Sequence, residues 1–408
     1  MPEPELNPFS YQFHEDPHPI YRRLRESAPL YRNEKMAFWA LSRFRDVQAA
    51  LMDWQTYSSA EGILLERMDP RMFEITPMMI FLDPPRHSRL RKLVSRAFTP
   101  RRVADLESSI RAAAVRLLEP LVEHGDGDFV EDFSGPFPME VICTLLGVPE
   151  ADRSQCRQWM DQALDRDPDT PELPSRALEA MMNLSRYWYG LADDLHQRPN
   201  DGLVSALFDA EIETDDGHAT KLTEGELVGL CSVLAGGGNE TTTRLLANAA
   251  VLFARHPEAY HDVLADPALI PRAVEEVLRY SSPAQYAART VMRDVEWYGT
   301  TVPRGDRILL LIGAANRDER EYPDPDRFDI RRKIPNQLAF GEGVHFCIGA
   351  PLARLESRVA LEEFTKRFPR YEVDESRARR IHMSNVHGYA SVPFRGRPDG
   401  RPRSEPGR

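Results

Sequence analysis

The sequence predicts a mainly α-helical fold with a small β region, arranged as one large domain. Apolar residues recur at three- and four-residue spacing over several long stretches, whereas strand-like stretches are few and short. No internal repeat and no glycine- or serine-rich linker divides the 408 residues. We therefore expect one domain over residues 1–394, followed by a basic, disordered tail over 395–408 that is rich in Pro, Gly and Arg.

The predicted helices have clear start and stop signals. The longest begins at Thr223, which fits a capping box with Glu226, and ends before Pro257. At about thirty residues it is well above the mean length and should cross the whole domain. Another starts with Pro351 in its first turn and ends before Pro369. Two further amphipathic helices are expected over 106–125 and 175–199.

The predicted strands are short and lie near turn residues. We expect a hairpin over 31–44, two strands within 295–318, and a late hairpin over 384–394 with Gly388 at its turn. The proline-rich, polar stretch 165–176 predicts a loop between two helices, not a domain boundary.

Composition excludes several classes of protein. The formal net charge of −12 disfavours nucleic acid as a partner. The sequence has no run of about eighteen apolar residues that would predict a membrane span. Its acidic, proline-rich start does not resemble a signal peptide. Four cysteines do not make a disulfide framework in a chain of this length, so we expect Cys143, Cys156 and Cys231 to be reduced packing residues. We expect a cytoplasmic monomer.

The centre of the longest helix has an unusual composition. Gly236, Gly237 and Gly238 each cost about 1 kcal/mol relative to alanine, and Glu240 and Thr241 follow almost directly. The glycines could serve only to let another helix approach, but that does not explain a costly acid in an apolar helix. We favour a bent or widened helix that passes a flat ligand, where Glu240 and Thr241 handle protons or water.

Cys347 stands in an equally unusual frame, "AFGEGVHFCIGAPLARLE" (339–356). The helix that follows should stabilise a thiolate at its N-terminus, and the nearby glycines permit a tight turn around the sulfur. Such a sulfur could be a nucleophile with His345 as its base, or a metal ligand. A zinc or iron–sulfur site needs more thiolates, and no C-x-x-C motif is present. A single axial thiolate to a haem iron fits this frame.

This frame resembles the haem-binding loop of the cytochrome P-450 monooxygenases. The matching residues are Phe340, Gly341, Gly343, His345, Cys347 and Gly349. Other segments resemble the family's motifs in the same order along the chain: "DPPRHSRLRKLV" (83–94), "GGNETT" (237–242), "EEVLR" (275–279), "AART" (287–290) and "PDPDRFD" (323–329). The resemblance covers the chain to about Phe394. It points to the short, soluble bacterial branch with the cytochrome P-450 fold.

The resemblance implies a role for each matching residue. The cofactor is expected to be haem b (iron protoporphyrin IX), with Cys347 as the axial ligand and its loop contributing Phe340, Gly341 and Gly349. The haem propionates are expected to be held by His87, Arg91, Arg289 and His345. A buried charge network is expected from Glu276, Arg279 and Arg327. Oxygen activation is expected to use Thr241 as the hydrogen-bonding group and Glu240 as the proton relay.

The implied activity is that of a haem-thiolate monooxygenase, which uses O2 to hydroxylate, epoxidise or dealkylate its substrate. No flavin or nicotinamide fingerprint is present, so electrons are expected from a ferredoxin or flavodoxin with an NAD(P)H-dependent reductase. The cations expected to receive an acidic donor are Arg86, Arg89, Lys92, Arg354 and Arg358.

The resemblance implies a substrate pocket formed by four segments, including the methionine-rich loop over 61–81. Other pocket residues are expected to include Val233, Gly237, Ala284, Val386 and His387. Methionines suit irregular apolar space, which favours a medium-sized apolar substrate such as a terpenoid, steroid, macrolide or fatty acid. Two alternatives stay open: a haem enzyme of the same fold that performs oxidative coupling or peroxide-driven chemistry, and a non-enzymatic haem sensor.

Overall fold

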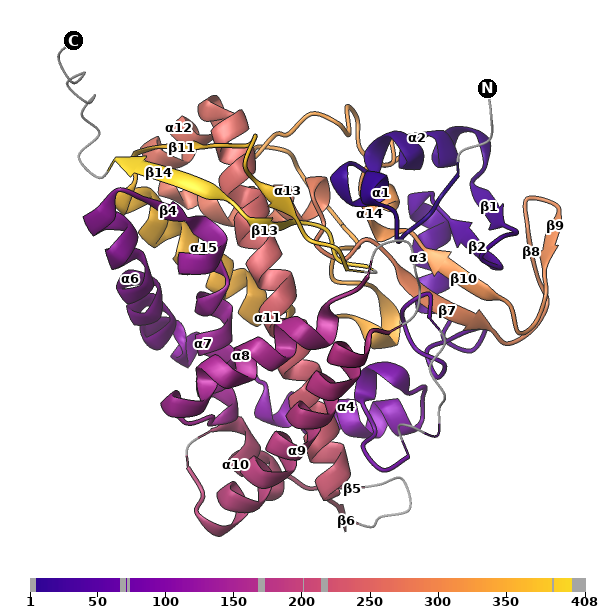
Figure 1. Ribbon diagram of the computed structural model, residues 1–408. Helices are drawn as coiled ribbons and strands as arrows, with labels where there is room; N and C mark the ends of the chain where they lie inside the picture. The colour runs from indigo at the N-terminus through magenta and orange to yellow at the C-terminus, as the bar shows by residue number, and fades with distance from the viewer. Residues whose placement is uncertain are drawn as a thin grey trace.

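The computed structural model describes residues 5–66, 71, 74–167, 173–200, 202–213, 219–383 and 385–397. Long helices make up most of the molecule, and the small sheets lie at its periphery, at the right, the upper left and the bottom of the view in Figure 1. The helices are α1 (Tyr11–Glu15), α2 (His18–Ser27), α3 (Phe44–Met52), α4 (Arg86–Ala97), α5 (Pro100–Asp105), α6 (Glu107–His124), α7 (Pro136–Leu146), α8 (Glu150–Leu164), α9 (Ser175–Gln197), α10 (Leu203–Phe208), α11 (Glu224–Arg255), α12 (Pro257–Ala265), α13 (Ile270–Tyr280), α14 (Ile312–Ala315) and α15 (Ala350–Arg367).

The strands form one sheet of five strands and several smaller ones. The five-stranded sheet has the order β1-β2-β10-β7-β3, and a three-stranded sheet has the order β11-β14-β4. The strands are β1 (Leu30–Asn33), β2 (Phe38–Leu41), β3 (Tyr57–Ser58), β4 (Asp126–Asp128), β5 (Ile212–Glu213), β6 (Ala219–Thr220), β7 (Ala287–Val291), β8 (Val295–Trp297), β9 (Thr300–Val302), β10 (Arg307–Leu310), β11 (Arg370–Val373), β12 (Arg379–Arg380), β13 (Tyr389–Ser391) and β14 (Pro393–Arg397).

Helix α11 runs through the middle of the molecule (Figure 1). The capping box predicted from Thr223 and Glu226 is present at its start, and it ends one residue before His256. Its 32 residues are mostly buried and contribute to two hydrophobic cores, one with α6, α13 and α15 and one with α7, α8 and α9. A helix buried on nearly all sides fixes any group it carries relative to the rest of the domain.

The sequence predicted the main helices and the first hairpin correctly. Helices α6, α9 and α15 lie where periodicity placed them, and β1 pairs antiparallel with β2. The region 295–318 holds three strands instead of two. The predicted loop over 165–176 lies between α8 and α9, and residues 168–172 of it fall outside the described residues.

Two predictions about the C-terminal region differ from the structure. Gly388 does not turn a hairpin over 384–394, because β13 pairs with β12 and the next strand, β14, pairs with β11 and β4. Gly388 is required instead by close packing, since a Cβ there would lie 2.7 Å from the Cβ of Arg244. The domain boundary predicted at Phe394 falls inside β14, and residues 398–408 of the predicted tail lie outside the described residues.

Two predictions drawn from composition can be compared with the structure. Cys143, Cys156 and Cys231 are free and buried, as predicted for packing residues. Among the described residues, no helix combines the length and apolar character needed to cross a bilayer.

Candidate active site

The centre of α11 leaves open space beside it. A Cβ placed on Gly236 or Gly237 would meet no atom within 4 Å. The Thr241 hydroxyl donates a hydrogen bond of 2.6 Å to the Gly237 carbonyl, one turn earlier. The helix remains α-helical throughout, so the predicted widening is not present. The glycines therefore act by removing side chains from one face, which leaves room for a flat ligand.

The Cys347 loop is shaped by two glycines in the left-handed region, Gly341 (φ 71°) and Gly343 (φ 69°). The Gly341 amide donates to the Leu338 carbonyl at 2.8 Å, and the Cys347 amide donates to the Phe340 carbonyl at 2.8 Å. These bonds close a tight turn that presents Cys347 just before α15. The sequence prediction of such a turn at a helix N-terminus is confirmed.

The Cys347 sulfur has two opposing electrostatic influences. Burial raises the pKa of the thiol, whereas the amides of Gly349 and Ala350 and the charges of Arg91 and Arg354 lower it. Burial is the larger of the two effects on the Cys347 thiol. The helix N-terminus therefore does not by itself give the stabilised thiolate that the sequence predicted. Within the described residues, no group of three or more metal-binding side chains is present. Cys347 therefore suits a metal that takes a single protein ligand.

Four basic side chains gather beside this loop, and all four were predicted from the sequence. The rings of His87 and His345 lie 4.4 Å apart between centroids, and Ser59 Oγ lies 3.2 Å from His345 Nε2. Burial, aided by the charges of Arg289, His87 and Arg91, lowers the pKa of His345 to about 2. Burial also lowers the pKa of Arg289 to about 10.

No ion pair of these four bases with a carboxylate is present within the described residues. Burial and the Arg91 charge lower the pKa of His87 to about 4, while Asp83 opposes this at longer range. A cavity of about 540 Å³ borders His87 and Arg91 on one side and Gly343 and Val344 on the other. Two arginines without a paired carboxylate in the described part of the chain, beside two neutral histidine rings that can donate hydrogen bonds, fit a ligand with anionic groups, as the two haem propionates would be.

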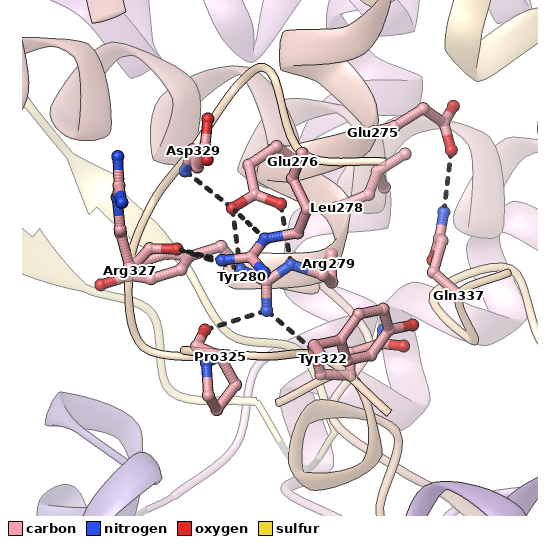
Figure 2. Close-up of polar contacts among 12 residues, drawn as sticks. Glu275, Glu276, Leu278, Arg279, Tyr280, Tyr322, Pro325, Arg327, Asp329 and Gln337 are labelled. Carbon is pink, nitrogen blue, oxygen red and sulfur yellow. Dashed lines mark hydrogen bonds and ion pairs between the residues drawn. The ribbon is translucent and has the colours of Figure 1, made fainter. Parts of the chain in front are cut away.

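The predicted charge network is present, but its third member is different. Arg279 donates to both oxygens of Glu276, at 2.7 and 2.8 Å, and both side chains are almost fully buried. The Arg327 side chain is exposed and points away, and only its carbonyl faces Arg279 (Figure 2). Arg332 instead reaches Glu276 at 3.4 Å. The prediction for Arg327 was therefore wrong, because the turn over 323–329 directs its backbone inward.

This network is connected to the cysteine loop. Arg279 donates to the Asn316 carbonyl at 3.1 Å, and the Asn316 side chain accepts the Leu338 amide at 2.7 Å. The Leu338 carbonyl in turn accepts the Gly341 amide. A short chain of hydrogen bonds thus links the buried ion pair to the turn that presents Cys347, and it gives the network a positioning role.

Glu240 is not free in the structure. It forms a buried ion pair with Arg244, whose Nε lies 2.7 Å from Glu240 Oε1, and Arg244 also donates to the Tyr389 carbonyl. The i,i+4 spacing of these two residues was readable from the sequence and was missed. Desolvation raises the pKa of Asp161, on α8, to about 6, and the nearby Glu240 carboxylate contributes to the rise. Asp161 is a further acid near this pair that sequence reasoning did not identify.

The predicted substrate-pocket residues separate into two groups. Val233 and Gly237 lie on the central part of α11, and Ala284 forms an isolated β-bridge with Val386. His387 lines a different cavity, described below, because successive residues of an extended segment point to opposite sides. Part of the methionine-rich loop, residues 67–70 and 72–73, lies outside the described residues.

Comparison with known proteins gives consistent results over nearly the whole chain. The family model described as cytochrome P450 matches residues 182–388. A Mycobacterium tuberculosis protein designated cytochrome P450 123 is 44% identical over 395 residues, which cover 96% of this chain and 97% of that protein. The vitamin D(3) 25-hydroxylase of Pseudonocardia autotrophica is 39% identical over 360 residues, 86% of each.

Solved structures agree with these sequence matches. CYP109E1 from Bacillus megaterium, in complex with corticosterone, matches with a TM-score of 0.83 at 32% identity. The match covers 94% of this chain and 99% of that one.

Proposed function

This chain belongs to the cytochrome P450 family, and from that membership we propose that it oxidises a medium-sized, mostly apolar small molecule with O2. The family makes it a monooxygenase with haem b as its cofactor. The observation that carries the assignment of its residues is the convergence of three features: one framed cysteine, four uncompensated basic side chains, and a helix face cleared by glycines.

The residues present fit haem b in a definite arrangement. Cys347 would supply the thiolate that binds the iron, and His87, Arg91, Arg289 and His345 would bind the propionates. When bound, a thiolate-ligated haem activates O2 for insertion into a substrate C–H bond. Thr241 holds a hydroxyl proton at the open face of α11, in its bond to the Gly237 carbonyl.

Proton supply to Thr241 is proposed to pass through Glu240, with one condition set by the structure. Glu240 Oε1 is occupied by the Arg244 guanidinium. A relay therefore requires either the second carboxylate oxygen or a transient opening of this ion pair. Asp161, whose side chain is half exposed and lies 3.8 Å from Arg157, is a further acid through which solvent protons could reach Glu240.

The proposed substrate class rests on the pocket residues and on the relatives. The face of α11 at Gly236 and Gly237 and the Ala284–Val386 bridge present small or aliphatic side chains. One relative is named as a vitamin D(3) hydroxylase, and one solved neighbour was determined with corticosterone. A steroid-like or similarly sized apolar substrate fits both observations, and we propose hydroxylation as the outcome.

Electrons are proposed to come from a ferredoxin or flavodoxin through an NAD(P)H-dependent reductase. Of the five predicted docking cations, three are engaged within the protein. Arg89 pairs with Glu226, Arg354 with Glu275 at 2.6 Å, and Arg358 with Glu107 at 2.6 Å. Arg86 and Lys92, on α4, are exposed. We propose that these two, and not Arg354 or Arg358, receive an acidic donor in the cytoplasm.

The first test is the absorption spectrum of the dithionite-reduced protein with carbon monoxide. A strongly red-shifted Soret band is expected, because it reports a thiolate bound opposite the gas. Cys347→Ser should abolish the shift, while Cys231→Ser, a buried cysteine elsewhere, should preserve it. A shifted band that survives Cys347→Ser would overturn the assignment of the ligand.

Thr241→Ala tests the oxygen-activation role. The variant should still consume reducing equivalents but release peroxide in place of product, because the hydroxyl proton at the open face is lost. Thr242→Ala, one residue along and buried, is the matched control. Full product formation by Thr241→Ala would contradict the proposal, and turnover by peroxide alone would favour the peroxide-driven alternative.

A further inference from the structure

A second cavity, of about 490 Å³, lies beside the C-terminal half of α11. Neither Cys347 nor any of the four basic side chains beside it lines this cavity. Its walls come from the start of α2, the end of α13 and the segments around Arg317, Arg380 and His387. A cavity of this volume is in the range of sites for small organic molecules.

The floor of this cavity holds buried polar atoms without partners. His387 is only 4% exposed, and neither of its ring nitrogens makes a hydrogen bond of normal geometry; the nearby Glu15 backbone only partly opposes the lowering of its pKa. Asn248 is 1% exposed; its amide nitrogen donates to the Ser281 carbonyl at 3.2 Å, but its Oδ1 has no partner. Nδ1 of His18 is buried and unpartnered as well. A buried polar atom left unpaired costs about 1–3 kcal/mol, so this group of atoms indicates a place for a ligand.

Four arginines and four carboxylates line the cavity, and three of the arginines are held in ion pairs. Arg22 and Arg317 share Asp326, and Arg255 pairs with Glu375.

The remaining guanidinium, that of Arg380, lies 3.9 Å above the Tyr389 ring. It forms no ion pair or side-chain hydrogen bond within the described part of the chain, and Glu15 and Asp16 attract it only at longer range. Burial and the charges of Arg317 and Arg380 lower the pKa of both His18 and His387, which agrees with a positive potential at the floor.

The mouth of the cavity has the opposite character. Glu15 and Asp16 are exposed there, and the Asp16 carboxylate accepts only the His18 amide, at 3.1 Å. The negative charges of Glu15 and Asp16 at the entrance would repel a ligand that carries many negative charges. Val251, Leu252 and Ala378 add an apolar wall deeper inside. The cavity thus suits a ligand with a single anionic group at one end and an apolar body.

We propose that this cavity binds a small organic molecule through one oxyanion group, a carboxylate or a phosphate. The oxygens would accept hydrogen bonds from the Arg380 guanidinium and the His387 ring, and the organic body would lie against Val251 and Leu252. The site is separate from the haem and goes beyond the proposed monooxygenase function.

The test is isothermal titration calorimetry on the haem-loaded protein at constant ionic strength, balanced with chloride. The probes are phenyl phosphate, benzoate and inorganic phosphate. We expect saturable one-to-one binding of phenyl phosphate or benzoate, at least tenfold tighter than inorganic phosphate because the apolar wall adds contact. The Soret band should not shift, since the ligand does not reach the haem. Absence of saturable binding by all three probes would overturn the proposal.

Two neighbouring arginines supply a matched pair of variants. Arg380→Gln should weaken binding at least tenfold, whereas Arg379→Gln, whose side chain is 68% exposed, should change it less than twofold. Equal losses in the two variants would show non-specific attraction and overturn the proposal. If Arg380→Gln fails to fold, His387→Asn decides: a loss of threefold or more supports the site, and unchanged binding refutes it.

Discussion

Replacing Arg332 with Gln should destabilise the protein far more than the same change at Arg327. Arg332 is mostly buried and touches Glu276 at 3.4 Å and the carbonyls of Pro323, Asp324 and Arg327 at 2.6, 2.9 and 3.1 Å. Water can replace Arg332 at these carbonyls, so each contact is worth about 0.5–1 kcal/mol. The three carbonyl contacts sum to about 1.5–3 kcal/mol and the longer contact with Glu276 adds little, so the expected loss is about 2–3 kcal/mol.

Two further variants set the scale for this prediction. Arg279→Gln leaves the 1%-exposed carboxylate of Glu276 without its bidentate partner and should cost about 3–5 kcal/mol. Arg327→Gln changes an exposed side chain and should stay within about 0.5 kcal/mol.

The measurement is the urea concentration at the midpoint of unfolding of the haem-loaded protein, monitored by circular dichroism. For a chain of this size the slope exceeds about 3 kcal/mol/M, so Arg332→Gln should lower the midpoint by somewhat under 1 M and Arg327→Gln by under about 0.2 M. A shift for Arg327→Gln as large as that for Arg332→Gln would refute the reasoning and restore the role predicted from the sequence.

Three further predictions follow from buried or constrained residues. Burial and the neighbouring His382 lower the pKa of His14 to about 4. As pH falls from 6.5 to 4, the unfolded chain binds a proton at His14 that the folded protein does not. The free energy of unfolding, which is not reduced by His14 above pH 6.5, therefore falls by about 3 kcal/mol over this range. His14→Gln should flatten this part of the stability–pH curve and His124→Gln, an exposed histidine, should not; equal slopes would contradict the assignment. Gly343→Ala should lower the urea midpoint and haem retention more than Gly299→Ala, because both have φ near 70° but only at Gly343 would a Cβ lie 2.9 Å from a carbonyl, that of Leu51. If Gly343→Ala retains haem as well as Gly299→Ala does, the close contact with the Leu51 carbonyl does not determine haem retention. Reversing Arg86 and Lys92 to Glu should slow reduction by the donor in stopped flow, whereas reversing Arg354 and Arg358 should act mainly through stability; unchanged rates in the first pair would exclude α4 as the docking face.

Sequence reasoning succeeded where the signal is local. The capping box at Thr223, the glycine-framed turn before Cys347 and the Glu276–Arg279 pair each depend on residues within a few positions of one another. The third member of the charge network could not be chosen in this way. The segment that holds Arg327 and Arg332 has no periodicity, so only the tertiary path of its turns decides which side chain points inward.

Two other sites were missed although a local signal was present. Glu240 and Arg244 are four residues apart on one helix, which places them side by side. Val386 and His387 are adjacent in an extended segment, which sends their side chains to opposite sides. The family resemblance gives a role to Glu240 without its partner, and it places both Val386 and His387 in one pocket, which the alternation of an extended segment excludes.

The two buried charge centres of the molecule show what separates a structural site from a binding site. At Glu276 and Arg279 every charged group has an opposite charge or a carbonyl in reach, so the cluster is complete within the protein. At His87, Arg91, Arg289 and His345, burial and the neighbouring bases lower the pKa of the two histidines, and no ion pair compensates the two arginines within the described residues. The residue types alone do not distinguish the two clusters. The number of internal partners does, because an incomplete buried cluster is stable only when a ligand supplies the missing charge.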